Sequence, residues 1–229
     1  IIILQIVGFS ELLEAHDNYQ SLERLLDYLY FMPHVYFLNQ EEIKDKISNQ
    51  TETMDIDFDA FSEALISRDI GKIETILKSF ITEAAGLNVS VEYLHGAILK
   101  FVFLYNHFMR DIMKGNKNMN DTQIFKDINE LYNSEDFYFW FVKLIKTTFD
   151  ELSSMEENPK RAVVQLIEKV IVENLTENLS LDFIAEKVFL SPKYVSRIFK
   201  EEKGINITQF ITECKLKKAT KLLLECNTP

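Results

Sequence analysis

The sequence predicts a mainly α-helical protein in which a helical domain precedes a helix-turn-helix module. Two observations support this fold class. Apolar residues recur at helical spacing almost without interruption from about residue 58 onward. Near the end of the chain, two short helical segments that begin at Ser180 and Ser191 are separated by only a tight turn. A small α/β remnant is expected at the N-terminus.

Composition excludes several classes of protein. Of the 229 residues, 47% are hydrophobic and 27% charged, with six Gly and four Pro, which is typical of a globular domain and not of a disordered or fibrous chain. No stretch is long and apolar enough to span a membrane, so no membrane contact is expected. The apolar start, residues 1–8, lacks the basic region and cleavage site of a signal peptide, and we expect the chain to be a fragment of a longer protein.

The cysteines predict the compartment. Cys214 and Cys226 lie on one predicted helix. Their spacing separates them by about 18 Å, which is beyond disulfide reach. Two reduced thiols are typical of a cytoplasmic protein.

Residues 1–40 predict the tail of an α/β domain. Residues 1–8 have the β-branched character of a buried strand, residues 19–31 carry a leucine stripe at helical spacing, and residues 34–38 form a second short apolar run. Pro33 separates the helix from the second strand. Strand, helix and strand in this order are typical of an α/β unit.

Residues 41–157 predict a helical regulatory or connector domain. Ser90 is expected to cap a long core helix that reaches Met113, because this segment is apolar on most of its circumference. The aromatic run Phe137–Phe141 is interpreted as core, with a ligand pocket as the alternative. The other predicted helices lie at about 58–66, 73–81, 121–132 and 134–154.

Residues 158–229 predict the helix-turn-helix module. Asn158 can cap a helix and Pro159 can open it, so the domain boundary is placed here. Ala185 is small enough to let the second helix of the motif cross closely over the first. Gly204 stands where a left-handed C-cap is expected, and a further helix is predicted at about Ile207–Glu225.

The second helix of the motif presents a polar stripe of Lys193, Ser196, Arg197 and Lys200. Three cations and a hydroxyl on one face suit a helix that lies in the major groove of DNA, where Arg can read guanine through two hydrogen bonds. The formal net charge of −11 argues against nucleic-acid binding, because phosphate contacts need Lys and Arg. This charge, however, is an average over two unlike parts of the chain. Residues 1–158 carry −14, residues 159–229 carry +3, and residues 185–221 carry +5.

These residues resemble the AraC/XylS family of bacterial transcription regulators. The resemblance covers about 50 residues, through Leu181…Ile184-Ala185, Leu190-Ser191-Pro192, Tyr194-Val195-Ser196-Arg197-Ile198-Phe199-Lys200, Gly204, Phe210-Ile211, Lys215-Leu216, Ala219 and Leu222-Leu223. It implies a transcription factor whose recognition helix, Ser191–Lys203, enters the major groove. It places base-reading positions at Lys193, Ser196 and Arg197, and phosphate contacts at Ser191 and Lys200. With Tyr194, these make up the candidate DNA-binding residues.

The chain departs from the family pattern in two places. Lys215 stands where the family usually has Arg, and the family's second helix-turn-helix would begin just after Pro229. The layout of the first 158 residues is similar to the middle region of large family members built like two-component response regulators. The expected partners are double-stranded DNA, a second copy of the chain, and a small-molecule or protein signal.

No catalytic constellation is recognisable in the sequence, so we predict no enzyme, no catalytic residue and no cofactor. Asp55, Asp57 and Asp59 resemble the start of a calcium loop, but the Gly and Glu that such a loop needs later are replaced by Ala60 and Ile66. We therefore expect no metal site and a helix N-terminus instead. The alternative function is a helical protein-interaction or small-molecule-sensing module that does not itself bind DNA tightly.

Overall fold

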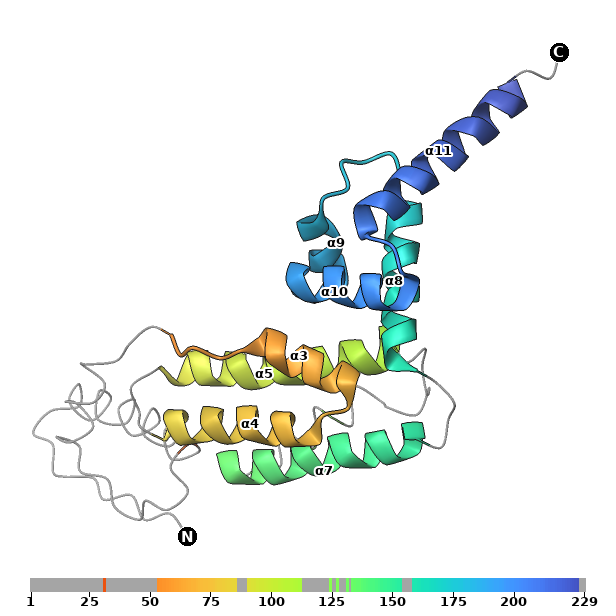
Figure 1. Cartoon of the computed structure of the whole chain (residues 1–229). Coiled ribbons are helices and arrows are strands. Elements are labelled where there is room, and N and C mark those ends of the chain that lie inside the picture. The colour runs from red at the N-terminus through yellow and green to blue at the C-terminus, as the bar shows by residue number, and fades with distance from the viewer. Residues whose placement is uncertain are drawn as a thin grey trace, which may run out of the picture. The chain divides into compact units, whose positions relative to one another are not determined.

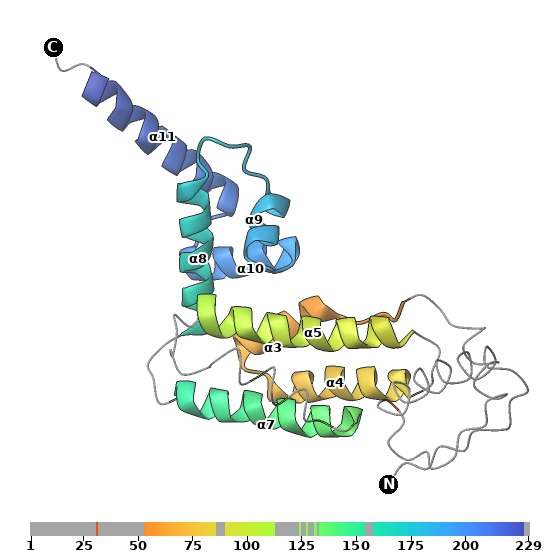
Figure 2. The same ribbon diagram turned by 180° about the vertical axis from the view of Figure 1, so that it is seen from behind.

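A computed structural model of the chain describes residues 53–85, 90–112, 133–153 and 158–226, together with the single residues Phe31, Ile124, Asp127 and Leu131. The described part is helical throughout (Figures 1 and 2). Its elements are α3 (Phe58–Ser67), α4 (Ile70–Ala84), α5 (Val91–His107), the π-helix η1 (Phe108–Ile112), α7 (Ser134–Ser153), α8 (Pro159–Glu173), α9 (Leu181–Lys187), α10 (Pro192–Lys203) and α11 (Ile207–Cys226). The prediction of a mainly α-helical protein is confirmed.

The helices belong to two compact units. In the described part of the chain, the first unit holds α4 from Glu74, α5 as far as Lys100 and α7 as far as Ile145. The second unit holds α3, the rest of α4, α5 from Phe101, η1, the rest of α7 and all of α8 to α11. Each unit is described below by itself.

The first unit has an aromatic core on α7. Phe137 and Phe141 are completely buried and their rings stack with centroids 5.2 Å apart. Trp140 stacks on Phe141 at 5.8 Å, whereas Phe139 points outward. The interpretation of this aromatic run as core is therefore correct for the two residues that share the inner face of the helix.

The second unit is built around the end of α5. Phe101 packs against Phe61 of α3 with ring centroids 4.9 Å apart. The buried hydroxyl of Tyr105 lies 2.6 Å from that of Thr148. Asp57 caps α3, because its Oδ1 accepts from the backbone N–H of Ala60 at 2.7 Å. The acidic run before α3 thus supplies a helix cap, as expected.

The two helices of the predicted helix-turn-helix, α9 and α10, lie within the second unit, where α10 packs on α8 and α9. The predicted caps are present: Asn158 opens α8, Ser180 opens α9 and Ser191 opens α10, each through a side-chain oxygen that accepts a backbone N–H. Gly204 ends α10 with φ of 74°, in the left-handed region that favours glycine. The buried residues of this module include Ile167, Ile184, Ala185, Val195, Ile198 and Phe199.

The turn of the motif contacts the end of α5. Phe189, at the centre of the turn, has φ of 53°, which is uncommon for a residue with a side chain. Its ring lies against those of Phe103 at 5.1 Å and His107 at 4.7 Å. The Nε2 atom of buried His107 lies 3.1 Å from the carbonyl oxygen of Val188. These contacts hold the turn in place despite its unusual backbone.

Helix α11 extends away from α8, α9 and α10 (Figure 1). Cys214 and Cys226 both lie on this helix, as predicted, and Cys214 is a free thiol. Desolvation, helped by the nearby carboxylates of Glu168 and Glu213, raises the pKa of that thiol. A raised pKa makes Cys214 a poor nucleophile at neutral pH.

Some sequence-based predictions fall outside the described residues. The α/β remnant of residues 1–40 and most of the helix expected at 121–132 lie there. The division into 1–40, 41–157 and 158–229 stays a prediction. None of the described helices is long and apolar enough to cross a membrane.

The close crossing of α9 and α10 gives a stability prediction. Ala185 is 2% exposed in this module, so Ala185→Leu should destabilise the protein by about 1–3 kcal/mol through overpacking. Urea unfolding followed by circular dichroism measures the change. The matched control is Ala219→Leu on the exposed part of α11, for which we expect a change within about 0.5 kcal/mol. Equal effects of the two substitutions would contradict the predicted close crossing.

Candidate nucleic-acid interface

Helix α10 is the element that positions the candidate DNA-binding residues. Its inner residues Val195, Ile198 and Phe199 are 1% exposed or less. Because an α-helix repeats every 3.6 residues, burial of this face turns the intervening positions outward. Lys193, Arg197 and Lys200 are accordingly exposed, and their spacings of four and three residues place them on one stripe.

The two serines of the candidate set occupy intermediate positions. Ser191 is half-buried at the start of α10, where its Oγ accepts from the backbone N–H of Tyr194 at 3.3 Å. Pro192 follows without a backbone N–H, so the cap satisfies the N–H of Tyr194 and leaves that of Lys193 at this end of α10. Ser196 is also half-buried and lies beside Arg197 along the chain.

Tyr194 differs from the other candidates because its side chain is 5% exposed. Its ring lies beneath the guanidinium of Arg197, with 4.9 Å between the ring centroid and Cζ. Burial, reinforced by the carboxylates of Glu63 and Glu201, raises the pKa of Tyr194 to about 12. The phenol therefore stays uncharged, and its ring packs against the guanidinium of Arg197.

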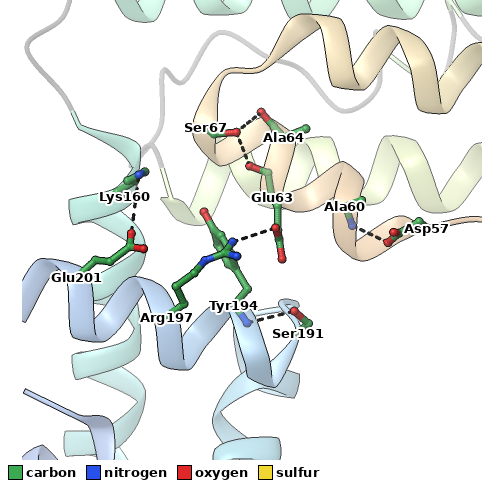
Figure 3. Close-up of polar contacts among 10 residues, drawn as sticks. All are labelled: Asp57, Ala60, Glu63, Ala64, Ser67, Lys160, Ser191, Tyr194, Arg197 and Glu201. Atoms are coloured by element: carbon green, nitrogen blue, oxygen red, sulfur yellow. Dashed lines mark hydrogen bonds and ion pairs between the residues drawn. The ribbon is translucent and has the colours of Figure 1, made fainter.

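Arg197 makes an ion pair with α3. Its Nη2 donates to Oε2 of Glu63 at 3.0 Å (Figure 3). The side chain of Arg197 is 49% exposed and that of Glu63 25% exposed. Sequence reasoning missed Glu63, because 134 residues separate it from Arg197 and no local pattern links the two.

Two further ion pairs join α10 to α8. Lys203 Nζ lies 2.6 Å from Glu168 Oε1, and Lys160 Nζ lies 4.0 Å from Glu201 Oε2. These pairs flank the packed face of α10, and their partly exposed side chains add little to its stability. Lys203 belongs to the predicted recognition helix, but its ammonium group is paired with α8.

Helix α11 adds positive charge to the second unit. Lys215, Lys217 and Lys218 are all exposed on it. Their clustering in the sequence is part of the local excess of +5 over residues 185–221. Among the described residues, no group of three or more His, Cys, Asp or Glu side chains could hold a metal ion.

Helix α10, which follows α9 after a short turn, thus carries an exposed cationic stripe. A stretch of 72 residues is 35% identical to the bifunctional transcriptional activator/DNA repair enzyme AdaA of Bacillus subtilis (strain 168). It covers 31% of this chain and 34% of that relative, so the similarity spans about a third of each protein. No family model matches the chain, and no solved structure matches it.

This match contradicts the prediction that the chain is not an enzyme, because the relative is described as a DNA repair enzyme as well as an activator. The prediction was based on the lack of a recognisable catalytic motif and is withdrawn. Catalytic sites assembled from residues that are distant in the sequence leave no such motif, so the lack of a motif does not exclude catalysis.

The raised pKa of Tyr194 predicts a loss of stability in alkali. The unfolded chain releases this proton near pH 10, whereas the folded protein keeps it to about pH 12. Its contribution is fully present below pH 10 and is lost between pH 10 and 12, by about 1 kcal/mol at pH 11. Urea midpoints at pH 9 and 11 measure the loss.

The control for this prediction is Tyr194→Phe. Tyr105, whose pKa burial also raises to about 12, continues to contribute in that variant. The variant should therefore show a smaller alkaline loss than the unmodified chain. An unchanged loss would mean that Tyr194 ionises equally easily in the folded and unfolded states.

Proposed function

We propose that the chain is part of a sequence-specific DNA-binding transcription regulator of the AraC/XylS type, with α10 as the helix that enters the major groove. The observation that carries the proposal is the exposed stripe of Lys193, Arg197 and Lys200 on the second helix of a capped helix-turn-helix. The similarity to a transcriptional activator supports it independently.

Five of the six candidate residues have a proposed role. Lys193 and Arg197 read base edges, because they lie on the exposed stripe and can donate hydrogen bonds to guanine. Ser191 and Lys200 hold phosphates at the edges of the groove. Tyr194 is too deeply buried to reach a base and acts by supporting Arg197 from below.

The other parts of the chain have proposed roles as well. We assign signal transmission or self-association to residues 41–157, with a small molecule, a protein or a second copy of the chain as the input. A regulator of this class acts in the cytoplasm, where its partner is double-stranded DNA.

The alternative is a helical interaction or sensing module that does not bind DNA tightly. The salt dependence of binding separates the two functions. Contacts to phosphate release counterions, so log K should fall linearly with log salt, with a slope of about −3 for three to four phosphate contacts. Fluorescence anisotropy of a labelled duplex across 50–300 mM salt measures this slope.

The same titration can also support the alternative function. Absence of any salt-dependent binding to duplex DNA at low salt would overturn the proposed function. A thermal shift on addition of candidate effectors would then be the next measurement, because a ligand that binds the folded state raises the melting temperature.

Arg197→Ala tests the assignment of the base-reading residue. Loss of a bidentate contact should weaken binding to the preferred site by about 1–3 kcal/mol and relax the preference at one base pair. Binding to a panel of duplexes, each changed at a single base pair, measures both effects.

The matched control is Lys169→Ala. Lys169 is an exposed cation on α8 that pairs with Glu173 of the same helix. Its loss removes the same charge without changing α10. If Arg197→Ala weakened binding equally on every duplex, Arg197 would contact phosphate only.

A further inference from the structure

The proposed base-reading arginine is held by a carboxylate from outside the helix-turn-helix. Glu63 lies on α3 and accepts a hydrogen bond of 3.0 Å from Arg197 Nη2. Reading a guanine edge requires two N–H groups of the guanidinium at once. While Nη2 donates to Glu63, the guanidinium of Arg197 is oriented toward α3 and cannot use this nitrogen to read a base.

The ion pair lies in a cleft whose charged residues are paired with one another or balanced. Arg197 and Tyr194 line a cleft of about 380 Å³. Three carboxylates (Glu63, Asp69 and Glu201) and three cations (Lys72, Lys160 and Arg197) line it, so the charges of the cleft balance. Figure 3 shows Glu63 and Arg197 pointing toward each other across the space between their helices. A phosphate that approached Arg197 would have to compete with the carboxylate of Glu63, which already contacts the guanidinium at 3.0 Å.

Helix α3 is a firm support for Glu63. Its N-terminus is capped by Asp57, and its inner residues Phe61 and Leu65 are 0% and 1% exposed. At the other end, the Ser67 hydroxyl donates to the backbone carbonyl of Glu63 at 2.9 Å. The carboxylate is therefore presented from a fixed backbone.

The turn of the motif is held by a second contact in the same unit. His107 Nε2 and the Val188 carbonyl are 3.1 Å apart, and the Phe189 ring packs edge-on against His107. The helix-turn-helix is thus attached at its turn by a buried hydrogen bond and a ring contact, and on its reading face by an ion pair. The two attachments differ in kind, so the second can open while the first persists.

We propose that the Glu63–Arg197 pair is an autoinhibitory latch that keeps the reading face of α10 closed until DNA or a signal breaks the ion pair. This inference rests on the proposed function. Because half of the Arg197 side chain is exposed, solvent weakens the pair. The ion pair therefore contributes little free energy, and breaking it should raise DNA affinity by about two- to five-fold.

Glu63→Gln in the full chain tests the latch. The substitution keeps the shape of the side chain and removes its charge. The probe is a fluorescein-labelled duplex selected from a random-sequence pool by the unmodified chain. We expect about two- to five-fold tighter binding than that of the unmodified chain, with unchanged helical content by circular dichroism.

The control separates the latch from a general charge effect. Glu173→Gln removes the same charge from α8, where Glu173 pairs with Lys169 of its own helix. It should strengthen binding less than Glu63→Gln does. Equal gains from the two substitutions would overturn the latch, because they would show that only net charge matters.

A double-mutant comparison tests whether the effect passes through Arg197. In an Arg197→Ala background, Glu63→Gln should gain no more than Glu173→Gln, because the latch has no partner left to release. A larger gain that persisted in this background would overturn the proposal. If no variant bound DNA at any salt, the proposed function itself would fail, which is distinguishable from failure of the latch alone.

Discussion

Burial of one face of α10 is the constraint on which the candidate site depends. Val195, Ile198 and Phe199 leave water almost completely when α10 packs on α8 and α9. Each buried aliphatic or aromatic side chain contributes about 1.5–3 kcal/mol, more than any exposed charge on the same helix can. The hydrophobic face therefore sets the rotation of α10, and the exposure of Lys193, Arg197 and Lys200 follows from it.

The parts of the structure that could be predicted are those specified by neighbouring residues. In a helix cap, a side-chain oxygen accepts a hydrogen bond from a backbone N–H only two or three residues later. Asn158, Ser180 and Ser191 could therefore be identified from the sequence. Gly204 was identifiable for the same reason, since a left-handed C-cap favours glycine. Periodicity of 3.6 residues predicted most of the described helices.

Contacts between distant segments could not be predicted. Glu63 and Arg197 are 134 residues apart, and each looks like an ordinary exposed charge in its own helix. Tyr194 was grouped with the DNA-binding residues, but its 5% exposure follows from packing that no neighbour specifies. The prediction about enzymes failed on similar grounds, because a motif search detects only residues that are close together in the chain.

The two compact units are interleaved along the chain, and this affects the order in which they can fold. The contacts among α8, α9 and α10 join residues close in sequence and are suited to forming early. The contacts of α3 and of the end of α5 with this module close loops of 134 and 81 residues, at a greater entropic cost. During synthesis, the apolar face of α3 can therefore pack on α5 through Phe61 and Phe101 well before α10 exists, whereas its charged contact with Arg197 forms only when almost the whole described chain has been made.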